Sequence, residues 1–208
     1  MNRNLLIATA VLSGFWPGAA RALWISEVLY DAEGADAGRV FVELYGAPGT
    51  ALAGFALEGV NGSNGASGPL LELSGVIPDD GFFVVASESG GASEVTNADL
   101  LLTFDFQNGP DSILLLDAAD QVVDALGYGV FGAGDVFAGE GDPAPDPAAG
   151  QSVARLFADL DTGDNAADFA ALASPTPGSG ATQLPEPLPV ALLLCGGTAL
   201  VLWRRRRD

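Results

Sequence analysis

The strongest constraint on the fold is a series of short β-rich runs separated by turn residues. Trp24–Tyr30 and Arg39–Tyr45 are rich in β-branched, aromatic and large aliphatic residues, and Val40, Val42 and Leu44 fall on one face of the second run. Further runs of this kind are Phe55–Leu57, Leu70–Leu73, Gly81–Ala86, Ile113–Leu116, Val122–Leu126 and Ser152–Phe157. No segment between them has the spacing of an amphipathic helix, so we predict an all-β fold, an antiparallel β-sandwich.

Turn-forming residues mark the connections between these runs. Asn61–Pro69 is rich in Gly, Asn and Ser and is expected to be a loop, and Pro78–Gly81 is expected to be a turn. Asp117–Gln121 would close a hairpin between two runs. Pro143–Pro147 has core strands on both sides, so we interpret it as a loop within a single domain, which we place at residues 23–173.

The middle of the chain is strongly acidic. The 208 residues include 27 acidic and 8 basic side chains, a formal charge of −19, and every basic residue is Arg. Between residues 23 and 184 there are 25 acidic residues and two arginines. Nucleic-acid binding depends on basic side chains that displace counterions from phosphates, so we predict no nucleic-acid partner.

Residue types that commonly carry catalysis are missing from the sequence. The chain has no His, no Lys and one Cys. A Ser or Cys nucleophile would therefore lack an imidazole or amine base, and a single Cys excludes intrachain disulfides and thiolate metal clusters. Paired carboxylates could still act as acid and base, but no pair lies in an apolar, pocket-like context. We predict that the protein is not an enzyme.

Residues 1–22 have the pattern of a secretory signal peptide with an N-terminal signal helix. Arg3 gives the positive start, Leu5–Phe15 is apolar, and Ala20 and Ala22 form a small-x-small cleavage site. The apolar stretch is short for a membrane span and is followed by glycine and proline. We therefore expect export, with a mature chain that begins after the cleavage site.

The C-terminal end carries a second ordered set of features. Residues 174–184 are rich in Pro, Gly, Ser and Thr and are expected to form a linker. An apolar run of about 16 residues, Leu188–Trp203, is near the lower limit for a transmembrane helix. The positive-inside rule places the C-terminus in the cytoplasm. The flanking motif residues are Pro185, Glu186 and Pro187 before the run and Arg204, Arg205, Arg206 and Arg207 after it.

These C-terminal features resemble the PEP-CTERM sorting signal of Gram-negative bacteria over residues 185–208. The resemblance implies an intermediate in the inner membrane, processing by an exosortase, and delivery to the cell surface or extracellular matrix. Exopolysaccharide or surface proteins would then be the partners of the exported protein. The helix would be removed on sorting or kept as a membrane anchor.

Three stretches of the predicted domain are typical of one known family. They are Ile25–Asp31 with Val40–Tyr45, Leu52–Leu57 with Gly75–Val85, and Ser152–Arg155 with Asp161–Gly178. The most specific part is the string D-T-x-D-N-x-x-D-F at residues 161–169, followed by T-P-G at residues 176–178. The set resembles the lamin tail domain, although Ser179 and Gly46 replace asparagines that the family commonly has. The resemblance implies an immunoglobulin-like β-sandwich that acts as a non-catalytic binding or scaffolding module.

The acidic string near the end of the domain is also a candidate metal site. Alternating carboxylates and amides around a Gly turn provide the oxygen ligands that Ca²⁺ prefers. The candidate ligands are Asp159, Asp161, Asp164, Asn165 and Asp168. The match to an EF-hand loop is imperfect, because Gly163 precedes Asp164 and no Glu closes the loop. In the alternative, which the lamin-tail resemblance favours, these are turn residues and Asp164 or Asn165 caps a short helical turn.

Two other polar segments have a structural and a functional interpretation. Asp31, Glu33 and Asp36 could bind Ca²⁺ from a Gly/Ala loop, or they could be a solvated loop. Phe104–Ser112 contains an Asn-Gly turn and is interpreted as structural. Ca²⁺ is the one cofactor that the sequence suggests.

Glu27 and Glu43 lie inside predicted strands and could point outward or inward. If they point inward, each needs a partner such as Arg39 or Arg155, the two arginines of the domain. We therefore expect at least one of these arginines to form a structural ion pair.

The sequence supports one leading functional hypothesis and two alternatives. The leading hypothesis is an exported adhesion, scaffold or matrix-binding protein. The second is a Ca²⁺-dependent binding or adhesion module that uses the acidic loops. The third is a carboxylate-based hydrolase acting on polysaccharide.

Overall fold

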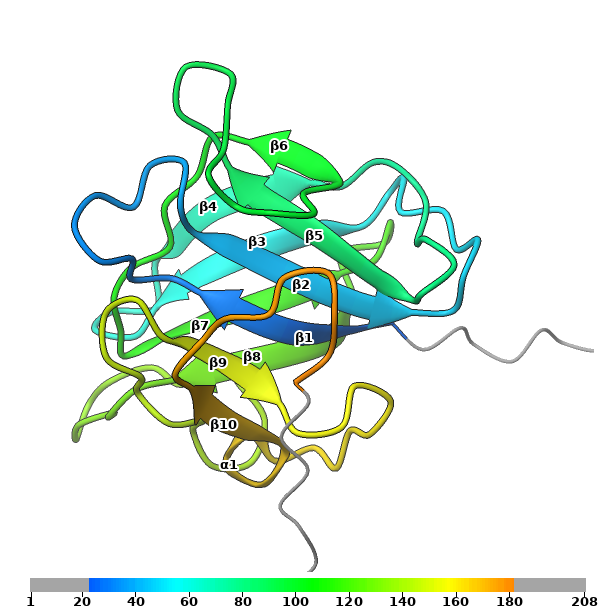
Figure 1. Cartoon of the computed structure of the whole chain (residues 1–208). Coiled ribbons are helices and arrows are strands. Elements are labelled where there is room, and N and C mark those ends of the chain that lie inside the picture. The colour runs from blue at the N-terminus through cyan, green and yellow to red at the C-terminus, as the bar shows by residue number, and fades with distance from the viewer. Residues whose placement is uncertain (1–22, 182–208) are drawn as a thin grey trace, which may run out of the picture.

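The computed structural model describes residues 23–181 and folds them into two β-sheets with one short helix (Figure 1). One sheet has the spatial order β10 (Phe169–Leu172), β9 (Ser152–Arg155), β1 (Leu23–Leu29), β2 (Phe41–Gly46), β5 (Phe82–Ser87) and β6 (Leu100–Leu102). The other has the order β4 (Ser67–Glu72), β3 (Ala56–Asn61), β7 (Asp111–Leu116) and β8 (Val122–Tyr128). The helix, α1, spans Asn165–Asp168. The all-β prediction is confirmed.

A single large apolar core joins the two sheets. Val42 and Leu44 of β2 and Ile113 and Leu115 of β7 are fully buried in it. Because side chains alternate along a strand, the residues between them face away from this core. The alternation read from the sequence at Val40, Val42 and Leu44 therefore identified the inner face of β2 correctly.

The outer face of the six-stranded sheet is also largely covered. Leu29, Phe41, Val84 and Ala86 form a second buried cluster, against which Val95 and Ala98 pack from the connection between β5 and β6. This covering explains why Phe41, on the outer face of β2, is buried. It also places Glu27 and Glu43, which share this face, in a buried environment.

The strand boundaries differ from the sequence prediction in several places. The predicted loop at residues 61–69 is shorter, because β3 runs to Asn61 and β4 begins at Ser67. The last predicted strand ends at Arg155. Two strands were not predicted: β6 is three leucines paired parallel to β5, and β10 follows α1 directly. Both are too short to show a period-2 pattern.

The predicted linker begins differently from the expectation. Residues 175–179 lie on the outer face of the six-stranded sheet, where Thr176 and Gly178 donate hydrogen bonds to Glu27 and Glu43 (Figure 1, orange). Two buried carboxyl groups that need donors account for this contact.

The predicted terminal segments lie outside the described residues. These are the signal peptide at residues 1–22, with Ala20 and Ala22, and the sorting signal at residues 185–208. Within residues 23–181, the structure contains no helix that has the length and apolar character to cross a membrane.

Candidate functional site

A buried polar cluster surrounds the guanidinium of Arg155. Strand β9 pairs with β1 only at Glu27 and Val28, next to an irregularity of β1 between Ile25 and Glu27. At Ile25 the backbone is bound by side chains instead. Its N–H donates to Asp124 Oδ2 at 2.6 Å, and its carbonyl accepts from Arg155 Nε at 3.1 Å.

Arg155 connects the six-stranded sheet to the edge of the other sheet. Its Nη2 contacts both carboxylate oxygens of Asp124 on β8, at 3.2 and 3.1 Å. Its Nη1 donates to Asp168 Oδ2 at 3.2 Å and to the Leu160 carbonyl at 3.0 Å, and its guanidinium lies 4.5 Å from the centre of the Phe169 ring. All five donor positions of a guanidinium need partners when it is buried, and this side chain is 1% exposed.

The predicted metal ligands Asn165 and Asp168 have structural roles. The Asn165 side chain accepts from the N–H groups of Gly127 and Glu140 and donates to the Ala125 carbonyl. Asp168 accepts from the Thr162 N–H and hydroxyl in addition to Arg155. Both side chains are buried and have these protein partners.

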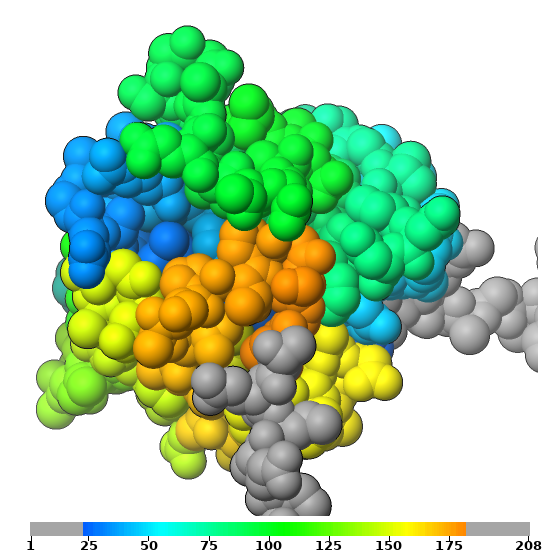
Figure 2. All heavy atoms as spheres, viewed as in Figure 1, coloured from blue at the N-terminus to red at the C-terminus, as the bar shows by residue number. Residues whose placement is uncertain are grey.

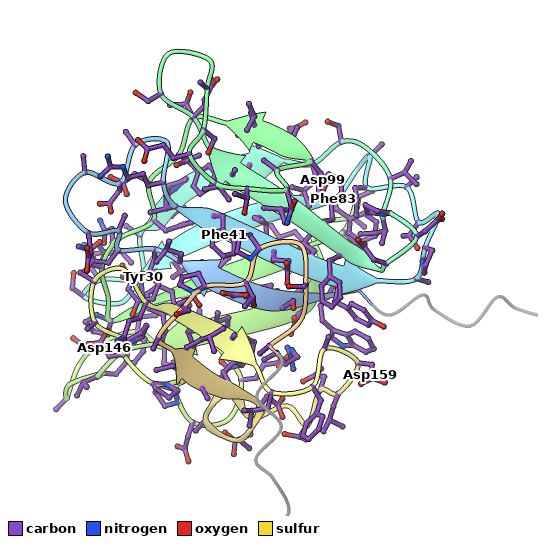
Figure 3. The ribbon with its side chains drawn as sticks, viewed as in Figure 1. Tyr30, Phe41, Phe83, Asp99, Asp146 and Asp159 are labelled. Carbon is purple, nitrogen blue, oxygen red and sulfur yellow. The ribbon has the colours of Figure 1, made fainter. Side chains whose placement is uncertain are left out.

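The other three predicted ligands do not converge. Asp164 is the N-cap of α1 and accepts from the Ala166 N–H, which confirms the capping alternative. Asp159 is exposed on the loop after β9, at the edge of the molecule (Figure 3). Of the five predicted residues, only Asp161 belongs to the carboxylate group that could hold a metal ion.

That group consists of Asp124, Glu140 and Asp161. One oxygen from each lies within 4.8 Å of the others. The Oε2 atom of Glu140 is buried and has no hydrogen-bond partner among the described residues. Burial, followed by the negative charge of Asp124, raises the pKa of Glu140 to about 7. A proton on Glu140 or a cation beside it would relieve this unfavourable position.

Burial also raises the pKa of Asp124, and the Arg155 charge opposes that effect. The guanidinium thus already serves as the counter-ion for the deepest carboxylate of the group. A hard cation would have to bind on the side of Glu140 and Asp161, where Asp161 Oδ1 is 3.5 Å from Arg155 Nη1.

The sequence analysis missed Asp124 and Glu140. Asp124 had a usable signal, because it is an acidic residue inside the predicted strand Val122–Leu126. A buried acid there would need a cation, and the predicted domain has two arginines. Glu140 had no usable signal. It is held near the group because its N–H donates to Asn165 Oδ1 and its carbonyl accepts from the Asn165 N–H, and no local pattern encodes these contacts.

The remaining acidic candidates have local structural partners. Asp36 Oδ1 accepts from the Ala32 N–H at 2.7 Å, which closes the loop that carries Asp31 and Glu33. Asp111 is buried and accepts from the Gly62 N–H at 2.6 Å, so it ties β7 to the loop after β3. These contacts agree with the structural interpretation of both segments.

The expected ion pair is present, with different partners from those considered. Arg155 pairs with Asp124 and Asp168, and Arg39 pairs with Glu94 at 3.1 Å on the surface. Glu27 and Glu43 both point into buried positions, but hydroxyl and backbone donors bind them. The suggestion that an arginine would partner either glutamate was therefore wrong. Arg155 is instead bound to Asp124 on strand β8, and Arg39 is bound to Glu94.

Comparison with known proteins adds no further constraint: no family model, curated protein or solved structure matches the chain.

Replacing Arg155 by Met should destabilise the domain strongly. The substitution leaves Asp124 and Asp168 buried without their charge partner, a change that typically costs about 3–5 kcal/mol. Arg39→Met is the matched control, because its partner is exposed and such pairs contribute about 0–1 kcal/mol. Urea unfolding of both variants measures the difference, and equal losses would contradict the role given to Arg155.

Replacing Glu140 by Gln should flatten the pH dependence of stability. The pKa of Glu140 is about 7 in the folded chain against 4.5 in the unfolded chain. The contribution of neutral Glu140 to folding stability is therefore fully present below about pH 4.5 and is lost as the pH rises through 7. The urea concentration at the unfolding midpoint of the wild type should therefore decrease, relative to that of the variant, as the pH is raised from 5 to 8. Parallel curves would exclude an elevated pKa at this position.

Proposed function

We propose that the chain is an exported, non-catalytic adhesion, scaffold or matrix-binding protein with one lamin-tail-like, immunoglobulin-like sandwich domain. One observation carries the domain assignment. The motifs on which the resemblance rests contact one another: Glu43 of the V-F-V-E-L run accepts from Gly178 of the T-P-G motif, and Glu27 accepts from Thr176. Residues more than 130 positions apart thus form one unit, as a shared family core would require.

The acidic string supports the same proposal. Asn165 and Asp168 bind backbone groups and Arg155, so the string contributes to the fold. The accessible surface of residues 23–181 has one partly exposed cation, Arg39, whose side chain is 41% exposed. Such a surface repels nucleic acid and suits a module that binds neutral glycans, basic surface proteins or divalent cations.

Sorting follows from the two ends in this proposal. The signal peptide directs export, the C-terminal helix holds an intermediate in the inner membrane, and an exosortase recognises Pro185, Glu186 and Pro187. The protein is then delivered to the surface or matrix of a Gram-negative bacterium.

Changing all three motif residues, Pro185, Glu186 and Pro187, to Ala should keep the protein in the inner membrane. The tagged full-length wild-type chain, produced in the same host with an exosortase, should instead reach the surface or matrix fraction. Pro145→Ala, which alters an exposed proline of the domain, is the control and should sort like the wild type. Recovery of the wild-type chain from the cytoplasm with both ends intact would refute the proposal.

A second candidate function is Ca²⁺-dependent binding. The specific observation that favours it is the buried, unpartnered Oε2 of Glu140 beside Asp124 and Asp161. The Arg155 charge beside the group opposes it, which is why it ranks second.

Calorimetric titration of CaCl₂ into the full-length chain separates the two candidates. The Ca²⁺ version predicts binding heat, a higher Tm, and a loss of both in Glu140→Gln. Asp159→Asn should bind like the wild type, because Asp159 lies outside the group. No heat and no change in Tm would exclude the Ca²⁺ version while leaving the sorting proposal intact.

A further inference from the structure

The segment Pro175–Ser179, here named the C-terminal strap, crosses the outer face of the six-stranded sheet. Figure 1 shows it over β1 and β2, and in Figure 2 it covers the middle of that face. A turn in which the Ser179 N–H donates to the Thr176 carbonyl at 3.0 Å shapes it. Pro175 and Pro177 also line a surface hollow beside Phe41.

Two carboxyl groups hold the C-terminal strap on the sheet. Glu27 Oε1 accepts from the Thr176 N–H at 2.9 Å and from the Ser152 hydroxyl at 2.5 Å, and its Oε2 accepts from the Thr176 hydroxyl at 2.7 Å. Glu43 Oε2 accepts from the Gly178 N–H at 2.6 Å. Three of these four bonds join the strap to the sheet.

The two carboxyl groups face each other in a buried position. Glu27 and Glu43 are directly paired residues of β1 and β2, and they are 1% and 0% exposed. The Oε1 atom of Glu43 is buried and has no hydrogen-bond partner among residues 23–181. Like charges at directly opposed positions repel, and burial strengthens the repulsion.

Among residues 23–181, no cation offsets a second charge at Glu43. Glu27 is the charged group on β1. On β5, the uncharged Val84 lies opposite Glu43, and its N–H is bound by the acidic Asp99. The strap contributes only backbone and hydroxyl groups. The arginines of the described chain are paired elsewhere, with Glu94 and Asp124.

These surroundings favour a neutral Glu43. Burial raises its pKa to about 8, hydrogen bonds from Gly178 and Ser26 oppose the shift, and the charge of Glu27 adds to it. Burial also raises the pKa of Glu27, against the hydrogen bonds from Ser152 and Thr176.

We propose that the C-terminal strap is a pH-controlled latch, which stays on the sheet while the Glu27–Glu43 pair holds a proton and detaches when both groups are ionised. The latch is closed at neutral and acidic pH and opens as the pH rises above neutrality. Opening would uncover the outer face near Phe41 and release the chain that leads to the C-terminal segment. This latch does not depend on the proposed function.

Amide hydrogen exchange of the full-length chain, in mild detergent, tests the latch. Protection of the Thr176 and Gly178 amides, corrected for the intrinsic rate at each pH, should fall at least about tenfold between pH 6 and 9.5. Protection of the β2 amide of Leu44 should stay constant. In Glu43→Gln the strap amides should remain protected at both pH values, whereas Glu72→Gln, an exposed acid on β4, should behave like the wild type.

Two results would overturn the latch. One is strap protection in the wild type that does not change with pH, and the other is the same fall in Glu43→Gln as in the wild type. If Glu43→Gln does not fold, the ¹³C carboxyl shift of Glu43 in the wild-type chain decides. A titration midpoint near 8 supports the latch, and a midpoint near 4.5 rejects it.

Discussion

A single buried guanidinium connects three segments of this domain that are far apart in sequence. Arg155 binds the Ile25 carbonyl on β1, the Asp124 carboxylate on β8 and Asp168 at the end of α1. The six-stranded sheet, the edge strand β8 of the other sheet and the helix that leads into β10 therefore meet at one charge. In a body with 25 acidic residues, this arrangement neutralises the two most deeply buried carboxylates of the region and lets β1 end its pairing with β9 without exposed backbone groups.

Within residues 23–181, the second polar assembly contains no cation. Glu27 and Glu43 are held by Thr176, Gly178 and Ser152, and the two arginines of the described chain pair with other carboxylates. Buried acids are therefore stabilised in two ways in this domain. Asp124 and Asp168 share an arginine, whereas the carboxyl groups under the strap accept hydrogen bonds, and the pKa of Glu43 is raised. The two assemblies use residues from the first and third stretches on which the resemblance rests, and those residues have structural roles.

The sequence predicted the parts of this structure that depend on local pattern. Alternation at Val40, Val42 and Leu44 identified a core strand, and Asp164 was a recognisable cap because capping needs only neighbouring residues. It failed where distant residues meet. Asp124 and Arg155 are 31 positions apart, and Glu43 and Gly178 are 135 apart, so no spacing rule could pair them. The same reason explains why three of the five predicted metal ligands became caps or fold contacts.

The central claim is that the acidic domain is organised around the Arg155–Asp124 contact. A double-mutant cycle tests it most directly, with Arg155→Met, Asp124→Leu and the double variant compared by urea unfolding of the full-length chain. The account predicts a coupling energy of about 2 kcal/mol, with the double variant more stable than the sum of the single losses implies. Coupling within about 0.3 kcal/mol of zero would contradict the claim, because that is the range seen for independent sites.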